Sequence, residues 1–424
     1  MSFVPMPESA RAKPAQTWFQ PRVVALEAAP QPTLLQHHAR LLDQAIDGEA
    51  VDGNQTAILV DGPETHAAMF DAMASARDHI NIESYIVEDD GPGQVLAELL
   101  VRKCAEGVRI NLIYDAVGSW STPTSYFEAL RAAGVQLLQF NPINPFRHPI
   151  AWSMHLRDHR KLLVVDGRVA FIGGVNISSV YSNRKGAERT AANPMAHWRD
   201  THLRIEGPVV EYLQWLFLDH WRAIAKGPAQ SGMYFPAANR VGAQRIAVAA
   251  CAAGRRRNPF YRALLGAIDG AQSSIHLTVA YFVPTRRLRR ALKRAARRGV
   301  DVRLALPGVS DSWATLAAGR ARYGSMLRAG VRIFERHNAM LHAKTVVIDG
   351  VWATVGSSNL DWRSLLHNAE ANVIVLDSGV AQQFEALFAQ DLEESKELTF
   401  DTWLARGWRA RVSEWVARRL EFFL

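Results

Sequence analysis

Cysteine is scarce in this sequence, and long apolar runs are missing. Only Cys104 and Cys251 occur among 424 residues, which excludes a disulfide framework and a cysteine-based metal centre and fits a reducing compartment. No stretch of about 18 uncharged apolar residues is present, so no segment is expected to span a bilayer. The first residues also lack the continuous apolar core of a signal peptide. These absences predict a protein that is cytosolic or attached to a membrane only at its surface.

Positive charge is in excess. The net charge of +8 and the pI near 9.6 favour polyanionic partners, and nucleic acid and an anionic membrane surface fit equally well. An arginine-rich composition that only keeps the protein soluble stays open as an alternative. A hydrophobic content of 48% and a charged content of 21% are ordinary for a folded chain, and the length predicts two domains.

The chain follows one plan twice. Residues 66–140 contain three units, each an amphipathic helix followed by an apolar, β-branched strand, and residues 260–335 contain three more. Gly-Val pairs mark the change from helix to strand. Alternating helices and buried strands predict an α/β fold class, in which each half is a mixed, mostly parallel sheet flanked by helices. A duplication this long predicts two similar lobes with a site at their interface.

Domain boundaries are expected where the periodicity stops. The first residues are rich in Pro, Ala and Gln and indicate a loose arm, in which LLQHHARLLDQAI forms a short helix that can dock on the body. The segment KGPAQSGMYFPAANRVG breaks all periodicity. The predicted division is an arm over 1–50, a first lobe over 51–225, a linker over 226–255, a second lobe over 256–400 and a C-terminal amphipathic helix over 401–424.

Each half carries one copy of a polar motif, HxKxxxxD. The copies consist of His159, Lys161 and Asp166, and of His342, Lys344 and Asp349. Small residues and an asparagine follow each copy, as GGVN ending at Asn176 and as GSSN containing Ser357 and Asn359. The His, Lys and Asp content predicts about 0.01 chance copies of this pattern. Two copies at matching places of a repeat are therefore not accidental.

The spacing of the motif suits a phosphate site. Alternate residues of a strand point to one face, so each motif His and Lys project together. The apolar run that follows buries the strand, Asp-Gly turns it back, and the small residues beyond let the next strand approach closely. A lysine cation beside the histidine repels a metal ion and suits phosphate. We therefore expect no metal and no cofactor.

The paired motif resembles the signature of the phospholipase D superfamily from about residue 55 to the end of the chain. Within that superfamily, INIESYIVEDDGPG, AFIGGVNIS, HWRDTHLRIEGPVV, AYFVP and LHNAEANVIV are similar to bacterial cardiolipin synthases of the form without N-terminal transmembrane helices. The resemblance implies two phospholipase D-type lobes with the active site at the lobe interface. The motif pair is highly specific for the superfamily, and the flanking stretches are less so for the synthase branch.

The resemblance also implies a two-step displacement through a phosphohistidine. By family pattern His159 is the nucleophile and His342 the acid and base, although the symmetry of the motifs leaves the reverse assignment open. Lys161 and Lys344 would hold the non-bridging oxygens of the phosphate. Asn176, Ser357 and Asn359 occur where the family has further phosphate donors.

Each catalytic histidine needs an acceptor for its second ring nitrogen. Asp200 in HWRDTH and Glu370 in NAEAN follow the two motifs at equivalent places. We expect Glu370 to orient His159 and Asp200 to orient His342, which crosses between the lobes, with a salt bridge or a strand-end cap as the alternative. Asp166 and Asp349 are expected to be turn residues whose carboxylates accept backbone donors.

The end of the chain, WLARGWRARVSEWVARRLEFFL, has an apolar helical face. That face consists of Leu404, Trp408, Val412, Trp415, Val416, Leu420 and Phe423, and arginines flank it. Such a stripe is typical of a helix at an anionic lipid surface. It is equally typical of an amphipathic helix that packs on its own domain.

The leading functional hypothesis is phosphatidyl transfer between two phosphatidylglycerol molecules, which yields cardiolipin and glycerol. Hydrolysis of phospholipids at the same site is the main alternative. A nuclease of the same superfamily ranks lower, because no clustered aromatic and basic stripe suited to stacking bases is present. The expected partners are a phospholipid substrate and an anionic membrane surface, with no nucleic acid. The protein is then expected in the cytoplasm, peripherally associated with the inner (plasma) membrane. Neither the acyl-chain preference nor any partner protein can be deduced.

Overall fold

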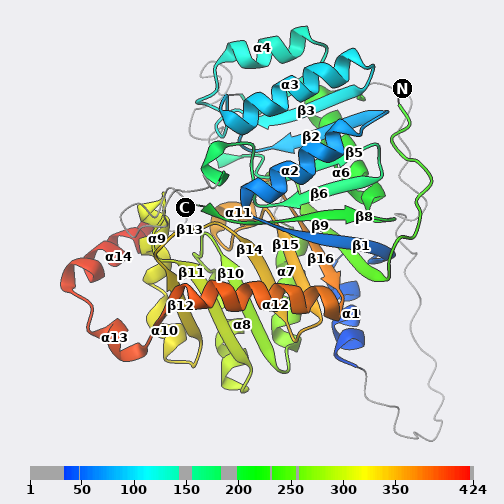
Figure 1. The fold of residues 1–424 in the computed structure, drawn as a ribbon. Coiled ribbons are helices and arrows are strands. Elements are labelled where there is room, and N and C mark those ends of the chain that lie inside the picture. The colour runs from blue at the N-terminus through cyan, green and yellow to red at the C-terminus, as the bar shows by residue number, and fades with distance from the viewer. Residues whose placement is uncertain are drawn as a thin grey trace, which may run out of the picture.

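A single large sheet organises the molecule. The computed structural model describes residues 33–46, 48–142, 155–182, 198–229, 232–254 and 257–420. In these residues a sheet of 15 strands runs through both repeats, with helices on both of its faces (Figure 1). The chain is therefore a mixed α/β protein, as the alternation of helix and strand predicts.

The first repeat forms one half of the sheet. Its helices α3 and α4 end at Gly-Val pairs as predicted, and Gly107 and Gly134 take positive φ angles of 86° and 105° there, which suit glycine. In chain order the elements are β1 (Val51–Val60), α2 (Asp61–Ala74), β2 (His79–Ser84), α3 (Gly91–Ala105), β3 (Arg109–Asp115), α4 (Thr124–Ala132), β4 (Gln136–Phe140), β5 (Lys161–Val165), β6 (Val169–Gly173), the 3-10 turn η2 (Ser179–Tyr181), β7 (Trp198–Arg199), β8 (Thr201–Glu206) and α6 (Val210–Ala225).

The second repeat forms the other half. Gly299 and Gly330 mark the same helix-to-strand changes, with φ angles of 93° and 92°. In chain order the elements are β9 (Gln244–Cys251), α7 (Pro259–Gly270), β10 (Ser274–Val279), α8 (Arg286–Arg297), β11 (Asp301–Pro307), α9 (Trp313–Arg320), α10 (Tyr323–Leu327), β12 (Arg332–Arg336), β13 (Met340–Leu341), β14 (Lys344–Ile348), β15 (Trp352–Gly356), α11 (Trp362–Leu366), β16 (Glu370–Leu376), α12 (Ser378–Glu393) and β17 (Ser395–Leu398).

The two halves meet at the β1–β9 pair. From β1 outward the strand order is β8, β6, β5, β2, β3 and β4. From β9 outward it is β16, β15, β14, β10, β11 and β12, which are the corresponding strands of the other repeat, with β17 added at the edge. Because β1 and β9 are antiparallel, an approximate twofold rotation relates the halves and brings their motifs toward a common axis.

The prediction of mostly parallel sheets is wrong. Among the described strands of the large sheet, only β2–β3, β3–β4, β10–β11 and β11–β12 pair in parallel. The other pairs are antiparallel, including those of both motif strands. A crossover helix returns the chain for each parallel pair, as the helix–strand alternation predicts. The motif strands β5 and β14, in contrast, are followed by tight Asp-Gly turns, and a tight turn reverses the strand direction.

The repeats share a hydrophobic core. Side chains of α6, including Leu213 and Phe217, belong to the same buried cluster as Val355 and Val373 of the second sheet half and Phe384 of α12. Separate buried clusters lie under α2, α3 and α4 in the first repeat and under α7 and α8 in the second. The shared cluster therefore joins the two halves by apolar packing as well as by the continuous sheet.

The arm and the linker of the predicted division both contribute to the folded body. Helix α1 (Leu34–Ala45) begins with a Thr33 capping box. It packs against α7 as expected, with Leu42 in the core of the second repeat. Residues 1–32 of the arm lie outside the described residues. The linker segment includes β9, a central strand bonded to both β1 and β16, so its second half belongs to the sheet. The remaining boundaries stay a prediction.

The C-terminal segment forms two helices rather than one. Helix α13 (Phe400–Leu404) and helix α14 (Trp408–Leu420) are separated by a break that contains Gly407. Helix α14 packs on α9 through Ala417. Among the described residues, no helix is long and apolar enough to cross a bilayer.

Candidate active site

Each motif histidine lies immediately before a buried strand that ends in a tight turn. His159 precedes β5 and His342 precedes β14. At the turns, Asp166 and Asp349 have positive φ angles of 51° and 53°. Their carboxylates accept backbone N–H groups at the start of the neighbouring strand, β2 or β10. His38 of α1 also contacts Asp349, at 2.9 Å. Asp166 and Asp349 are therefore turn residues, as the sequence predicts.

The two histidines contact carboxylates from the opposite repeat. Nδ1 of His159 lies 3.2 Å from Glu370 and 3.1 Å from the carbonyl oxygen of Ser357. Nδ1 of His342 lies 2.6 Å from Asp200. The contacts are therefore crossed between the repeats, as expected. Both neighbours of His159 Nδ1 are acceptors, so this nitrogen carries the proton and Nε2 carries the lone pair.

Backbone bonds hold each histidine beside the segment that supplies its carboxylate. The amide of His159 donates to the carbonyl of Ala369, which precedes Glu370, at 2.9 Å. The amide of His342 donates to the carbonyl of Arg199, which precedes Asp200, at 2.7 Å. The short parallel pair β7–β13 extends the second connection. Main chain and side chain therefore fix the same crossed geometry.

Glycines allow the strands to approach closely at this point, as the sequence predicts. A Cβ added at Gly174 would stand 2.1 Å from a carboxylate oxygen of Asp200, and one added at Gly356 would stand 2.4 Å from the carbonyl oxygen of Ala371. Neither position leaves room for a side chain.

Burial strongly affects the charges of the site. Burial, and then the neighbouring lysine cation, lowers the pKa of His159 and of His342 to about 4. Burial also lowers the pKa of Lys161 to about 7 and that of Lys344 to about 8. Both ammonium groups donate to the carbonyl of their own motif histidine.

The two carboxylates that contact the histidines keep their negative charge. Burial acts to raise the pKa of Asp200, but Lys344 and His342 outweigh it and hold the pKa below its usual value. Likewise, burial acts to raise the pKa of Glu370, and His159 and then Lys161 outweigh it. Two buried anions and two nearby lysines thus form a charge-balanced site that can bind an anion.

His159 and His342 line one cavity of about 320 Å³. Asn176 and Asn359 also line it, and their role as phosphate donors stays a prediction. Ser357 is fully buried, and its hydroxyl donates to Glu370 at 2.5 Å. In this arrangement Ser357 supports the Glu370 carboxylate, and its role as a phosphate donor stays a prediction.

Aromatic side chains form much of the cavity wall, which the sequence reasoning did not anticipate. The ring of Tyr85 lies 5.1 Å from that of His159. The rings of Trp198, Tyr181 and Tyr281 lie 4.8, 5.7 and 6.0 Å from that of His342. Comparison of the repeats gave only a weak signal, because Tyr85 and Tyr281 follow corresponding strands, β2 and β10, at positions one residue apart.

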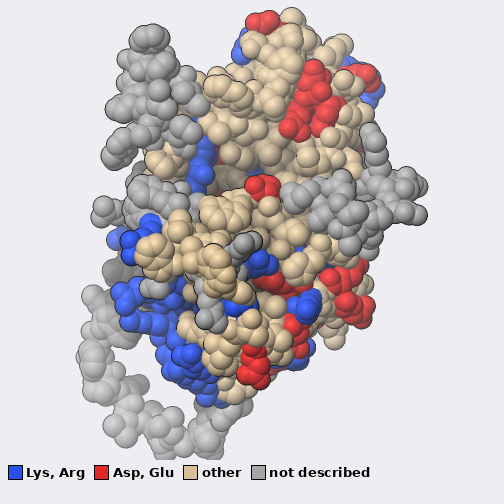
Figure 2. Space-filling model, turned by 90° about the vertical axis from the view of Figure 1, so that its left-hand side faces the viewer, with Lys and Arg blue, Asp and Glu red and all other residues tan. Residues whose placement is uncertain are grey.

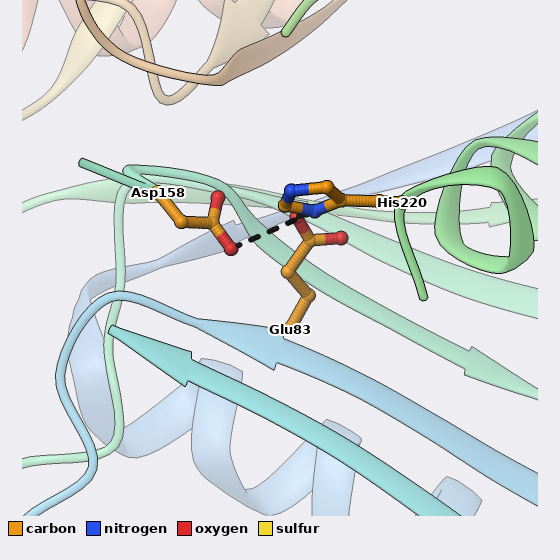
Figure 3. Close-up of side chains that lie close together, drawn as sticks. All are labelled: Glu83, Asp158 and His220. Carbon is orange, nitrogen blue, oxygen red and sulfur yellow. Dashed lines mark hydrogen bonds and ion pairs between the residues drawn. The ribbon is translucent and has the colours of Figure 1, made fainter. Parts of the chain in front are cut away.

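A polar cluster lies behind His159, on the face of the chain opposite to the cavity. Asp158 and Arg160 flank His159. Asp158 lies close to Glu83 of β2 and His220 of α6 (Figure 3), and Arg160 donates to Glu83. His220 Nδ1 lies 2.7 Å from Glu83 and 3.8 Å from Asp158. All four side chains are buried, and sequence reasoning missed the cluster because its acids are far apart along the chain.

The cluster carries a proton more readily than a metal ion. Burial raises the pKa of Glu83, and burial together with Glu83 raises the pKa of Asp158 well above its usual value. The potential ligand atoms of Glu83, Asp158 and His220 lie within 4.8 Å of one another. However, the Arg160 guanidinium already stands 3.3 Å from Glu83 and opposes a second cation. One proton on the carboxyl pair balances the charge.

Two similar halves define a phospholipase D-like phosphodiester-transfer protein: both motif histidines line one cavity, and each has a lysine and a carboxylate beside it. A family model described as "Cardiolipin synthase, PLD-like domain" matches residues 69–186 and 264–392. The chain belongs to this cardiolipin synthase family.

Relatives along most of the chain agree with this assignment. A cardiolipin synthase of Geobacillus thermodenitrificans is 34% identical over 95% of this chain and 78% of its own length. One of Halalkalibacterium halodurans is 34% identical over 86% of this chain and 71% of its own length. In fold, the crystal structure of phosphatidylserine synthase from Haemophilus influenzae Rd KW20 is similar, with a TM-score of 0.67, 14% identity, and coverage of 91% of this chain and all of that one.

Proposed function

We propose that the protein transfers a phosphatidyl group from one phosphatidylglycerol molecule to another, producing cardiolipin and glycerol. The observation that carries the proposal is the crossed pair of His–carboxylate contacts on one cavity, His159 with Glu370 and His342 with Asp200. The curated relatives named cardiolipin synthase support the choice of substrate.

In the first step, Nε2 of His159 attacks phosphorus and the bond from phosphorus to the glycerol oxygen breaks. Nε2 of His342 gives its proton to the departing oxygen. A phosphate anion bound beside His342 favours the imidazolium that this step needs. Lys161 and Lys344 stabilise charge on the two non-bridging oxygens.

In the second step, His342 takes the proton from a hydroxyl of the second phosphatidylglycerol. The resulting oxygen attacks phosphorus, and the bond from phosphorus to His159 breaks. The product is cardiolipin, and both histidines return to their starting states. Water entering in place of the second lipid would give phosphatidic acid, so the acceptor decides between transfer and hydrolysis.

We also propose peripheral binding to the plasma membrane through α14. Ala417 and Glu414 of α14 are buried against the body, whereas Trp408 and Trp415 are 70% and 56% exposed. Figure 2 views the side of the molecule that carries α14 and shows a broad neutral surface, with Lys and Arg gathered at its lower left. Exposed aromatic side chains beside cationic ones suit an anionic lipid surface. Leu420 and Phe423 of the predicted stripe lie outside the described side chains.

Two further exposed tryptophans support this orientation. Trp313, which is 59% exposed, begins α9 directly after the cavity residue Ser312. Trp120, which is 72% exposed, follows Ser119, whose hydroxyl donates to the carbonyl of the cavity residue Tyr85. Tryptophan favours the membrane interface, so these residues would hold the cavity opening against the lipid phosphates.

The test is incubation of the purified protein with phosphatidylglycerol vesicles in ¹⁸O-water, with lipid products identified by mass spectrometry. Cardiolipin and glycerol in equal amounts, without ¹⁸O in the lipid, are expected. Phosphatidic acid carrying ¹⁸O as the only product would instead make the protein a hydrolase.

A further inference from the structure

The cavity wall differs between the two repeats. The amide of Ile177 donates to the carbonyl of Ile86, and the amide of Leu360 donates to the carbonyl of Tyr281. Ile86 and Tyr281 therefore occupy corresponding positions, and both line the cavity. An apolar side chain in one repeat is thus matched by a phenol in the other.

Tyr281 forms a hydrogen-bonded pair with Asp311. Its hydroxyl donates to Oδ1 of Asp311 at 2.6 Å. Burial and then the Asp311 carboxylate raise the pKa of Tyr281 well above its usual value, so the phenol keeps its proton. Among the residues that the structure describes, no partner is found for Oδ2 of Asp311. Asp311 also lines the cavity, and an acceptor oxygen is therefore available there.

The pair lies on the side of the cavity that handles the alcohol. The ring centre of Tyr281 is 6.0 Å from that of His342, the residue that exchanges a proton with the reacting oxygen in the proposed function. Oxygens on adjacent carbons lie about 3 Å apart, given ordinary bond lengths. Because the pair lines the same cavity as His342, a hydroxyl one carbon beyond the reacting oxygen is directed toward it.

We propose that Asp311 and Tyr281 bind the hydroxyl adjacent to the reacting oxygen, and that they make the site selective for vicinal diols. The inference rests on the proposed function, because it specifies the alcohol that the site accepts and releases. Glycerol as leaving group and phosphatidylglycerol as acceptor both carry this hydroxyl. Water and simple primary alcohols lack it.

A hydroxyl fits the pair better than an ammonium group does. Arg157 and Arg363 line the same cavity, and the Lys344 ammonium lies 3.1 Å from Nε2 of His342. These cations oppose a positively charged headgroup. Moreover, Tyr281 already donates one hydrogen bond to Asp311. This bond partly stabilises the carboxylate, so a positively charged partner adds less.

The test is a competition between acceptors. Wild-type protein with a short-chain phosphatidylglycerol donor receives equal concentrations of 1,2-propanediol and 1-propanol, and mass spectrometry gives the ratio of the two transfer products. A hydrogen bond to a charged group predicts a preference for the diol of about tenfold or more. 1,3-Propanediol, whose second hydroxyl is one carbon further away, should behave like 1-propanol.

Variants show whether the diol preference depends on Asp311 and Tyr281 or on a general change in the protein. Asp311→Leu and Tyr281→Ile, the latter taking the residue of the first repeat, should bring the ratio to within about twofold of unity, whereas Asp311→Asn, which keeps an acceptor, should give an intermediate ratio. Glu128→Gln removes an exposed charge on α4 and serves as the control, with the wild-type ratio expected. An unchanged ratio in Asp311→Leu, or a wild-type preference for ethanolamine over the diol, would overturn the proposal.

A second measurement keeps this result separate from that of the proposed function. If no alcohol is ever phosphatidylated, transfer itself is wrong. The pair is then tested on the leaving group, by comparing kcat/KM for hydrolysis of phosphatidylglycerol and of phosphatidylpropanol. Wild type should prefer phosphatidylglycerol, and Asp311→Leu should lose that preference. Equal preference in both proteins would refute the role of the pair.

Discussion

Glu370 of the second repeat lies 3.2 Å from Nδ1 of His159 in the first. The contact means that each motif histidine depends on the other half of the chain for its carboxylate acceptor. Asp200 and His342 form the reciprocal contact at 2.6 Å. The carboxylate contacts hold both rings by Nδ1 and leave Nε2 as the other nitrogen of each ring, with the Lys344 ammonium 3.1 Å from Nε2 of His342.

Replacing either motif histidine should stop turnover. His159→Ala removes the nucleophile and His342→Ala removes the acid and base, so each should lower the rate of cardiolipin formation by more than about 10³-fold. Product formation is measured on phosphatidylglycerol vesicles, and thermal unfolding reports whether the fold is kept. A single variant that kept a tenth of the wild-type rate would contradict one shared site.

A covalent intermediate should be found on His159. During turnover, an alkaline quench preserves phosphohistidine, and peptide mass spectrometry then locates the phosphorus. His342→Asn lacks the base for the second step and should enrich the adduct on His159 when a donor with a good leaving group is supplied. An adduct on His342 in the wild-type protein would reverse the two roles without changing the family.

Activity should decline as the pH rises through about 7 to 8. The pKa of Lys161 is about 7 and that of Lys344 about 8, so rising pH removes the cations that hold the phosphate. kcat/KM for a soluble short-chain substrate, which reports the free enzyme, should fall over this range. Lys161→Arg keeps its charge, and its residual kcat/KM should fall less steeply. A wild-type profile that is flat to pH 10 would show that neither lysine titrates as described.

Helix α14 should bind anionic membranes. Moving an exposed tryptophan into the interface contributes on the order of 1.5 kcal/mol, so Trp408→Ser with Trp415→Ser should weaken vesicle binding by at least about tenfold. Cosedimentation with phosphatidylglycerol vesicles measures the effect, and rising salt should weaken the wild type further. Val95→Ser with Val101→Ser on α3 is the matched control.

These point variants are a sharper test than removal of the C-terminus. Trp403 belongs to the core of the second repeat, and Ala417 is buried against α9. A truncation after residue 401 would therefore remove core packing as well as the exposed stripe. Vesicle binding by the double tryptophan variant at the wild-type level would place the membrane contact elsewhere.

The cluster behind His159 should make stability depend on pH. Because burial raises the pKa of Asp158, its contribution to stability is present at low pH and is lost as pH rises through that pKa. Asp158→Asn cannot ionise, so its thermal midpoint relative to wild type should increase with pH. Asp219→Asn, at an exposed neighbour of His220, should show no such trend. A constant difference for Asp158→Asn across pH 5–9 would contradict a protonated carboxyl pair.

The duplicated motif made much of the site predictable. Once His159 and His342 were matched, equivalent positions for Asp200 and Glu370 followed, and so did their crossed contacts. The strand directions could be predicted only in part. Alternation of helix and strand indicates a parallel pair only where a helix links the two strands. Strand β9 was hidden within a segment whose Gly and Pro residues suggested a linker.

Groups outside the repeated pattern could not be predicted. Asp158 and Arg160 correspond to Leu341 and Ala343 in the second motif, so comparison of the repeats gives no hint of a polar cluster. Asp311 lies in a loop after β11, and only folding brings it to Tyr281. Such contacts join residues that are far apart in the sequence, and each contact occurs in only one repeat. They therefore leave no periodic signal.

Both halves of the site belong to one polypeptide. The antiparallel β1–β9 pair links them in one sheet. An assembly of two identical subunits would give both histidines the same neighbours by symmetry. A fused chain is free of that restriction, so the two halves can diverge through separate mutations. The halves do differ: Asp158 precedes one histidine and Leu341 the other, and Ile86 of the first repeat corresponds to Tyr281 of the second. Under the proposed function, a single chain can thus present one side of the cavity for the nucleophile and a different side for the alcohol.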